Sequence, residues 1–556
     1  MLGSKLSGQS FINPKQLFIG FSEPVIFTIA ALFIVARAVR IVGLIDSIAN
    51  IVLKGVTSSK HAILRVCLPL VGMSSFLNNT PIVAIFLPVL RKWSIQNKIS
   101  PSKLLIPLSY LTIFGGLCTQ LGTSTNLMLK GLSDEAGIVS FGIIDLAWVG
   151  LPASIFGIAY LYFFSAKILP GKDDILEDAK TEVAKHLLEM KVENNSPLIG
   201  KSIHDAHLRN LKDIFLFEVR REDKMIAPVK SNFVLDQNDI LVFSGDLKNL
   251  NHINSLEGLK VHNHNPQLEI PRDSVLIEVI ISPTSPLKGK TLKDVYFNRS
   301  YNAVVLSIQR GGEAFHKHYN NVLLNTGDTL LLLAGKGFRK IWQNRNDFLF
   351  VTPNREDLFD KKKAAPVLLM SLLMVLMPLC GLIDIVYTAC FTAVSFIWLK
   401  IIDSKEVVRI VDWSVLIVIA SSFGLSAALV SSGTAGILSS IMISLSSTVG
   451  LIGLLALIYL FTNILTEMVS NNAAAALLFP IALECSTKLN VSPTPFIIAI
   501  TIAASASFAT PIGYQTNTLV YGPGRYTYKD FFKIGLPLNI LYFIMSLTII
   551  PLVWKF

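Results

Sequence analysis

The chain alternates between long apolar segments and one central polar stretch. The stretch from about 170 to 362 is charged, alternates polar and apolar positions, and contains no long apolar run. Four apolar runs, at 62–76, 81–90, 449–466 and 473–485, are short. Eight others approach the roughly 20 residues that a spanning helix needs, namely 24–44, 104–121, 144–168, 364–380, 382–400, 412–432, 494–510 and 533–553. The pattern predicts an α-helical polytopic membrane protein with two membrane parts, 1–168 and 362–556, around a polar insert.

The two membrane parts repeat each other along the sequence. Segment 22–43 aligns with 412–433, and Asn79 in FLNNTP aligns with Asn471 in VSNNAA, at offsets between 390 and 392 residues. The loops GTSTN (122–126) and GYQTN (513–517) align at an offset in the same range. Many secondary transporters are built from such repeats, often inverted in the membrane. We therefore expect inverted repeats.

The insert is repeated as well. SPLIGKSI at 196–203 resembles SPLKGKTL at 285–292, and Asp239 and Asp328 stand 89 residues apart in matching turns. Runs such as IFLFEVRR, ILVFSG, AVVLSIQR and TLLLLAG are typical of short strands, with a polar turn before the last strand of each unit. We expect two tandem small α+β domains, at 180–265 and 268–352.

Polar clusters interrupt the short apolar runs. In LNNTP, three polar side chains and a proline separate two runs that are each too short to span a membrane comfortably. Irregular backbone inside a membrane is tolerated only where it is buried in protein or lines a cavity. The segment therefore predicts a re-entrant hairpin with Asn78, Asn79 and Thr80 at its tip, and the same pattern predicts a second hairpin with Ser470, Asn471 and Asn472 at its tip.

GTSTN and GYQTN interrupt two further helices, where Gly122 and Gly513 permit unusual backbone angles. The N-termini of the resulting half-helices would suit an anion. Asn, Ser and Thr oxygens and freed carbonyls would suit a small cation such as sodium. A single polar residue in a membrane helix more often bonds to a neighbouring helix, but four clusters at matching places favour a site.

For three further residues, the sequence leaves two possible roles open. Ser74 and Thr466 stand one helical turn before the hairpin tips, so each caps the turn or ligates a cation. Glu467 is an acid inside an apolar segment, which marks a functional candidate by default. It binds a proton or cation, or it faces a polar crevice.

Composition agrees with a membrane protein, since 52 % of the residues are hydrophobic and only 16 % are charged. The net charge of +11 is better explained by Lys and Arg in the loops than by nucleic-acid binding. Positive loops mark the cytoplasmic side, so we expect the cell membrane as the location and residues ~170–362 in the cytoplasm. The five cysteines are isolated and predict no transition-metal site.

With these residues, the chain resembles the divalent anion:sodium symporter family, within a superfamily of ion transporters that includes citrate and arsenite permeases. That family has Ser-Asn-Thr at two hairpin tips and Gly-Thr-Pro-Pro-Asn-like loops in two broken helices. The insert looks like two copies of the TrkA-C domain, the C-terminal lobe of potassium-conductance (RCK) regulators. The resemblance implies a homodimer in which an elevator-like mobile domain carries both hairpins and both broken helices past a scaffold.

The resemblance also implies site residues. One sodium site would use Ser74, Asn78, Asn79 and Gly122, and the other would use Thr466, Ser470, Asn471 and Gly513. The implied substrate residues are Asn79, Thr80, Thr123, Asn471, Asn472 and Thr516.

The chain departs from the family pattern. Asn78 replaces a serine at the first tip, Asn472 replaces a threonine at the second, and Thr125 and Thr516 replace a loop proline. The repeat offset places the counterparts of the two helices in 364–400 before residue 10, so we expect the first half to lack them. These changes leave the substrate and the coupling ion open.

The sequence thus predicts a permease for a small anion such as sulfate or a di- or tricarboxylate, coupled to sodium, with no cofactor beyond that ion. The alternatives are a proton-coupled or arsenite-type anion transporter and a TrkA-C-regulated ion channel, although no TVGYG-like filter is present. We do not expect an enzyme, because no nucleotide-binding, metal or nucleophile motif stands out. The TrkA-C-like domains keep two interpretations: they bind a small ligand of unknown identity, or they serve as dimerisation or packing modules.

Overall fold

The computed structural model describes most of the chain. The described residues are 18–43, 48, 51–138, 141–171, 187–208, 214–222, 224–226, 229, 232–245, 257–263, 274–282, 285–310, 313–315, 322–335, 337–342, 345, 347–350 and 361–556.

Helices form both membrane parts. The described helices of the first part are α3 (Pro24–Ile41), α5 (Ser59–Ser74), α6 (Asn79–Gln96), α7 (Leu105–Gly116), α8 (Ser124–Glu135) and α9 (Ala147–Ile168). Those of the second part are α14 (Lys361–Leu379), α15 (Ile385–Trp398), α16 (Val407–Ile410), α17 (Trp413–Ser431), α18 (Thr434–Ser446), α19 (Gly450–Thr466), α20 (Asn471–Leu489), α21 (Thr494–Ser505), α22 (Gln515–Tyr521) and α23 (Tyr528–Val553).

Four of the described helices, α3, α9, α17 and α23, are long and apolar enough to cross a membrane, and five shorter apolar helices accompany them. Two expected spans, 104–121 and 494–510, are only partly helical. Their helices α7 and α21 contain 12 residues each, because the chain leaves the helix before each polar loop. The expected runs 81–90 and 473–485 belong to longer helices, α6 and α20, which continue past Pro88 and Pro480. Helix α18 was not predicted, because serines interrupt its apolar pattern.

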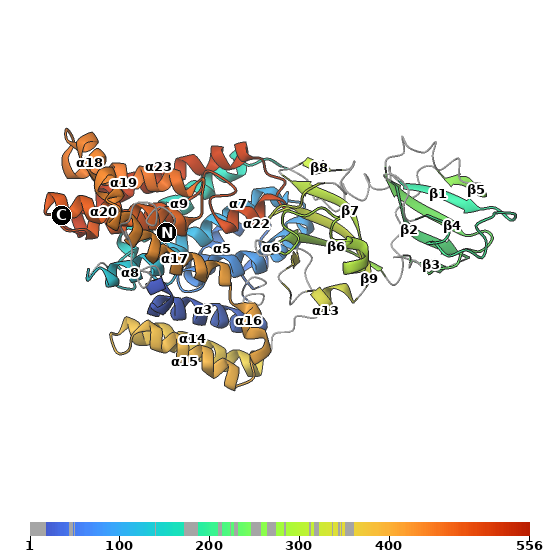
Figure 1. Ribbon diagram of the computed structural model, residues 1–556, viewed down its shortest axis with the longest axis horizontal. Helices are drawn as coiled ribbons and strands as arrows, with labels where there is room; N and C mark the ends of the chain where they lie inside the picture. Colours follow the sequence, from blue (N-terminus) through green and yellow to red (C-terminus); the bar gives the residue numbers. More distant parts are fainter. Residues whose placement is uncertain are drawn as a thin grey trace, which may run out of the picture.

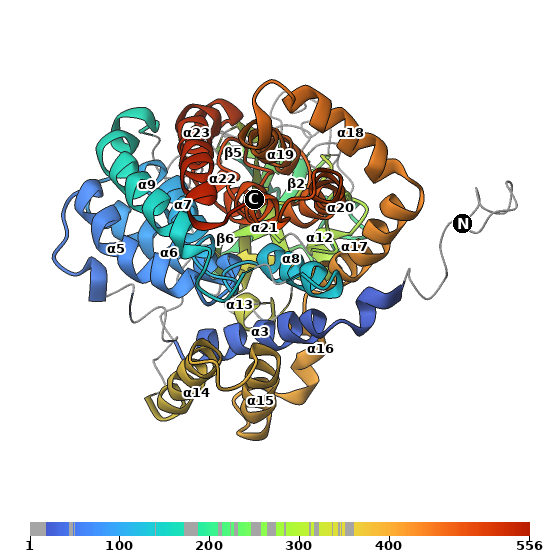
Figure 2. The ribbon, with the colours of Figure 1, turned by 90° about the vertical axis from the view of Figure 1, so that its left-hand side faces the viewer.

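The two parts pack in matching ways. α5 packs on α7, α6 on α7 and α7 on α9, and the corresponding helices α19, α20, α21 and α23 make the same three kinds of contact. The parts also exchange short helices, since α22 packs against α6 and α7 while α8 packs against α20 and α21. Helices α3, α14 and α15 contact one another and lie together along one side of the helical part (Figure 2).

The described residues of the insert form two five-stranded antiparallel sheets (Figure 1). The first sheet consists of β1 (Leu187–Val192), β2 (Ile214–Arg221), β3 (Lys224–Ile226), β4 (Ile240–Gly245) and β5 (Leu259–Asn263). The second sheet consists of β6 (Ser274–Ile281), β7 (Ala303–Arg310), β8 (Glu313–Phe315), β9 (Thr329–Gly335) and β10 (Phe348–Phe350), accompanied by the short helices α12 (Phe297–Tyr301) and α13 (Phe338–Trp342). The second sheet lies between the helices and the first sheet (Figure 1).

The two sheets share one topology. Their strand orders, β3-β2-β4-β1-β5 and β8-β7-β9-β6-β10, match strand for strand. Even the bulges coincide, between Leu216 and Glu218 in the first sheet and between Val305 and Ser307 in the second. The four strands predicted from the sequence are confirmed as β2, β4, β7 and β9. The other six strands were not predicted.

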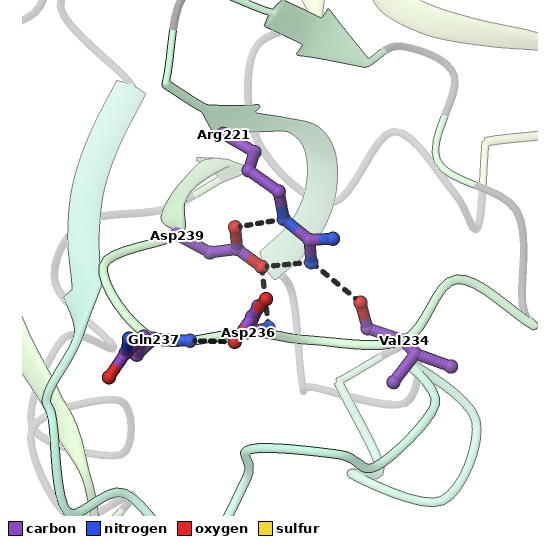
Figure 3. A network of polar contacts seen from close by, with 5 residues as sticks. All are labelled: Arg221, Val234, Asp236, Gln237 and Asp239. Atoms are coloured by element: carbon purple, nitrogen blue, oxygen red, sulfur yellow. Dashed lines mark hydrogen bonds and ion pairs between the residues drawn. The ribbon is translucent and has the colours of Figure 1, made fainter.

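An ion pair between a partly exposed arginine and a buried aspartate fixes the turn before β4. Both carboxylate oxygens of Asp239 accept hydrogen bonds from Arg221, at 2.7 and 2.8 Å, and the guanidinium also donates to the carbonyl oxygen of Val234 (Figure 3). Arg310 and Asp328 make the same two-pronged contact before β9, at 2.7 Å for each bond. Burial raises the pKa of Asp328, while Arg310 acts against that shift. The sequence repeat at Asp239 and Asp328 therefore corresponds to the same arginine–aspartate contact in both sheets.

Candidate functional site

The first predicted tip lies in the turn between α5 and α6. The Ser74 hydroxyl donates hydrogen bonds to the Asn79 side-chain oxygen and, at 2.7 Å, to the carbonyl oxygen of Thr112 in α7. Ser74 and Asn79 are completely buried. A Cβ at Gly116 would lie 2.9 Å from the Asn79 amide nitrogen, so the glycine lets helix α7 approach the tip. Three oxygen atoms thus meet in a closed cluster.

The second tip reproduces this cluster. The Thr466 hydroxyl donates to the Asn471 side-chain oxygen at 2.9 Å and to the carbonyl oxygen of Ala504 in α21 at 2.7 Å. Ser470 caps helix α20 by accepting a hydrogen bond from the backbone N–H of Ala473. Ser74 and Thr466 therefore occupy the same position in the two parts, as the sequence offset suggested.

The loops of the two broken helices also match. The Asn126 amide donates to the carbonyl oxygens of Gly116 and Thr119, at 3.0 and 2.8 Å. In the second part, the amide of Asn517 donates to the carbonyl oxygen of Ser507 at 3.1 Å, and to that of Thr510 at 3.0 Å. Each asparagine therefore replaces the helical hydrogen bonds that its broken helix lacks.

Gly122 and Gly513 are needed for a different reason than predicted. Neither has a positive φ. A Cβ at Gly122 would lie 2.6 Å from the backbone of Gly116, and one at Gly513 would lie 2.1 Å from the Ser507 hydroxyl. The expectation of unusual backbone angles was wrong. Both glycines are required by close packing of the loop.

Three side-chain contacts tie the halves together. Asn79 donates to the Tyr514 hydroxyl at 2.8 Å, and Thr80 donates to the Gln515 side chain at 3.0 Å. Thr125 of the first loop donates to the side-chain oxygen of Asn472 at 2.7 Å. Each tip is thereby bonded to the broken helix of the opposite half.

One cavity of about 770 Å³ lies between these elements. Of the predicted substrate residues, Thr80, Asn471 and Asn472 line it, together with the predicted cation residues Asn78, Ser470 and Gly513. The other predicted residues, Ser74, Asn79, Gly122, Thr123, Thr466 and Thr516, are buried and are not among the lining residues. Of the six residues predicted to contact a substrate, only the first three are therefore within reach of a molecule in this cavity.

Helices start at this cavity. Lining residues come from the first turns of α6, α8, α20 and α22, and the first three of these helices are 12 residues or longer. None of these first turns contains an acidic residue. The positive ends of the helix dipoles therefore lie at the cavity, and no carboxylate of these first turns offsets them.

Glu467 braces the second loop. One carboxylate oxygen accepts from the backbone N–H of Ala509 and the amide of Asn539, both at 2.9 Å, and the other accepts from the Thr510 hydroxyl at 2.7 Å. The Thr510 hydroxyl also approaches the Glu467 carbonyl oxygen, at 3.1 Å. Of the two interpretations kept for this acid, the structure favours a fixed residue in a polar crevice.

Two buried oxygens in the broken-helix regions have no hydrogen-bond partner, the side-chain oxygen of Asn126 and the hydroxyl of Ser507. Within the described residues, no group of three or more His, Cys, Asp or Glu side chains could hold a metal ion. The available ligands are hydroxyl, amide and carbonyl oxygens. Such ligands suit hard cations rather than transition metals.

Charged residues at the cavity come from several elements. Arg40 belongs to α3 and Arg409 to α16, while Arg345 and Asp347 belong to the second sheet region. Asp412 is also present, and its carboxylate caps α17. Burial raises the pKa of Asp347, while a hydrogen bond from Tyr301 and the charge of Arg345 oppose that shift.

Sequence reasoning missed several of these residues. Tyr514 and Gln515 stand inside the quoted loop GYQTN, and their position was the only signal. Ser109, which donates to Thr516 at 2.8 Å and to Asn517 at 2.7 Å, is a single serine in an apolar helix. No local pattern distinguishes it from an ordinary packing residue.

Apolar helices of spanning length, two matching halves and a cavity between them that both hairpin tips line fit a polytopic membrane protein built as transporters are. The chain belongs to the citrate transporter family, whose model matches residues 8–487. It is 32 % identical over 557 residues to an uncharacterized transporter of Synechocystis sp., covering 98 % of this chain and 91 % of the relative.

Two relatives come from Chlamydomonas reinhardtii. A putative sulfur deprivation response regulator is 30 % identical over 558 residues, covering 98 % of this chain and 95 % of the relative. A probable sodium/sulfate cotransporter 3 is 23 % identical over 733 residues, covering 94 % and 82 %. The family and its named transporters support an anion transporter and not an enzyme.

Proposed function

We propose that this chain is a secondary active transporter that moves a small oxyanion, such as sulfate or a di- or tricarboxylate, together with sodium. The observation that carries the proposal is the convergence of helices α6, α8 and α20, whose N-termini line one cavity. Helix N-termini offer free N–H donors and partial positive charge, which bind oxyanions. The relatives named sodium/sulfate cotransporters make sulfate the first substrate to test.

The two matching clusters behind the cavity are the proposed sodium sites. Each combines a hydroxyl, an asparagine oxygen and a main-chain carbonyl, centred on Ser74 with Asn79 and on Thr466 with Asn471. Each broken-helix region also holds a buried oxygen without a hydrogen-bond partner, the Asn126 side-chain oxygen in the first half and the Ser507 hydroxyl in the second. Sodium would replace the hydroxyl hydrogen bonds in these clusters and hold each tip against its broken helix.

The proposed mechanism is an elevator in a homodimer at the cell membrane. Helices α5–α8 and α19–α22 would form the mobile unit, with α3, α14, α15 and α17 in the scaffold. The repeats would be inverted, so that the same hairpin opens to opposite sides in turn. The insert would be cytoplasmic, and its two TrkA-C-like units would bind a small ligand or pack between protomers.

Proton coupling, as in an arsenite-type transporter, is the second candidate. The observation that favours it is Glu467, a carboxylate beside the second cluster. Its carboxylate oxygens accept three hydrogen bonds, from Ala509, Thr510 and Asn539, and this fixed geometry argues for a structural role in the second loop. A channel is less consistent with tips that are closed by hydrogen bonds to the opposite half.

Reconstitution in liposomes tests the proposal. We would measure uptake of radiolabelled sulfate with and without an inward sodium gradient, for the wild type, Asn79→Ala and Asn471→Ala. Leaving buried partners unsatisfied costs about 1–3 kcal/mol, which corresponds to a roughly 5- to 150-fold weaker apparent sodium affinity. Asn97→Ala is the matched control, because Asn97 bonds only within the end of α6.

The outcomes separate the hypotheses. Sodium-dependent uptake that weakens in both site variants and survives in the control would support two sodium sites. Uptake that follows a proton gradient and ignores sodium would support the second candidate. Absence of uptake for sulfate, citrate and succinate by well-folded protein would refute the proposed substrate class.

A further inference from the structure

The second sheet region forms part of the wall of the anion cavity. Pro286, Arg345, Asp347 and Leu349 line the same cavity as the two hairpin tips. These residues belong to the insert, which is part of neither the mobile unit nor the scaffold in the proposed mechanism. Because they line the cavity, the insert could contact an anion that is bound there.

The second sheet is held firmly against the transport helices. A buried ion pair joins Glu278 of β6 to Arg91 of α6. The loop before β9 touches α22, where a Cβ at Gly522 would lie 2.5 Å from the carbonyl oxygen of Gly327, and one at Gly327 would lie 2.8 Å from the Thr518 side chain. The backbones therefore pack too closely here to admit a Cβ at either glycine, and this packing and the ion pair together hold the second sheet beside α6 and α22.

A comparison with the first sheet shows why only the second sheet pairs with the transport helices at this position. Its Glu189 matches Glu278, but it pairs within the sheet, at 2.6 Å, with Arg220. The position that matches Arg220 in the second sheet is Gln309, which has no charge. Glu278 therefore pairs with a cation from the transport helices instead of one from its own sheet. The change at a single strand position adapts the second sheet to this interface.

Arg345 is the cation that this wall presents. It is an exposed residue, and its guanidinium lies 4.6 Å from the centre of the Trp342 ring, which orients the planar group. Guanidinium groups bind oxyanions through two parallel hydrogen bonds. Asp347 beside it is buried, so its charge is less accessible to an anion in the cavity.

We propose that the second sheet supplies part of the anion site and that Arg345 contacts the transported oxyanion and sets its apparent affinity. The proposal rests on the proposed function as an anion transporter. It predicts that removing the charge weakens binding while leaving the rate of movement nearly unchanged, because Arg345 lies outside both hairpins and both broken helices.

The test compares Arg345→Gln and Arg345→Lys with Lys293→Gln, which removes an exposed positive charge from the same sheet region outside the cavity. Sulfate uptake into proteoliposomes at saturating sodium gives KM and the maximal rate. Binding of radiolabelled sulfate to the purified full chain gives affinity without transport, and gel filtration checks folding.

We expect KM to rise at least about fivefold in Arg345→Gln, with the maximal rate within about twofold of wild type, partial recovery in Arg345→Lys and no change in Lys293→Gln. A sulfate affinity and KM within about twofold of wild type in Arg345→Gln would overturn the inference. An equal loss of sulfate affinity in Lys293→Gln would overturn it too. That result would mean that the overall positive charge of the insert, and not a contact with Arg345, sets the affinity. A wild type that neither binds nor moves an oxyanion would instead refute the proposed function.

Discussion

The ion pair between Arg91 and Glu278 should be a main source of stability for the contact between insert and helices. The two side chains are only 5 % and 0 % exposed, so water screens them little. At an effective dielectric constant near 20, two opposite charges about 4 Å apart attract by about 4 kcal/mol. Removing one partner leaves a buried charge uncompensated and typically costs about 3–5 kcal/mol. Glu278→Gln should therefore destabilise this interface by about 3 kcal/mol or more.

Thermal unfolding of the detergent-solubilised full chain measures the effect. We expect the melting temperature of Glu278→Gln to fall by about 5 °C or more. The double variant with leucine at both positions should recover most of the loss, because a buried ion pair can often be replaced by apolar residues at little cost. Asp134→Asn is the control, since its partly exposed pair with Lys130 should contribute less than about 1 kcal/mol.

The reasoning fails if Glu278→Gln melts within about 1 °C of wild type. It also fails if the double leucine variant is as unstable as the sum of the two single changes, because that would mean the charges do not act as a pair.

Two further predictions concern the cavity. Gly122→Ala should abolish transport, because its Cβ would lie 2.6 Å from backbone atoms of Gly116. Gly72→Ala, in the last turn of α5 and with nothing within 4 Å of the added Cβ, should transport normally, and sodium-dependent uptake of the two variants checks this. Asp347→Asn should lower the KM for a divalent anion about two- to fivefold, because it removes a negative charge from the cavity lining. This corresponds to up to about 1 kcal/mol at a partly screened site. An unchanged KM would show that this carboxylate does not act on the anion.

Much of the candidate site could be predicted because polar residues are costly inside an apolar segment. Asn79, Asn471 and the two loops stand out for that reason, and their repeated spacing indicated that they act together. Strands such as 303–310 and 329–335 were predictable from continuous apolar runs between turns. Helix α18 was missed because its serines, several of which bond to carbonyls one turn back, hide the apolar period.

The contacts between the two halves and with the insert could not be predicted in the same way. Pairs such as Asn79 with Tyr514 join residues 435 positions apart, and nothing in either local sequence names its partner. Glu278 was the one residue whose local sequence indicated a contact outside its own strand. An acid in the middle of the apolar strand SVLIEVII implies a buried cation nearby, yet the sequence does not say that this cation is Arg91.

The two clusters are alike in geometry but differ in charge. In both, a threonine hydroxyl of the broken-helix loop lies against a carbonyl oxygen of the hairpin turn, Thr119 against Ser75 and Thr510 against Glu467. The Thr119 hydroxyl donates to that carbonyl, whereas the Thr510 hydroxyl makes its shorter contact, at 2.7 Å, with the Glu467 carboxylate, which the first half lacks at this position. Its oxygen would lie 2.8 Å from a Cβ at Gly513, within the loop that closes the second cluster. Under the proposed function, the second cluster would hold its sodium more tightly than the first, and binding of the two ions would be ordered by this single difference between otherwise matching halves.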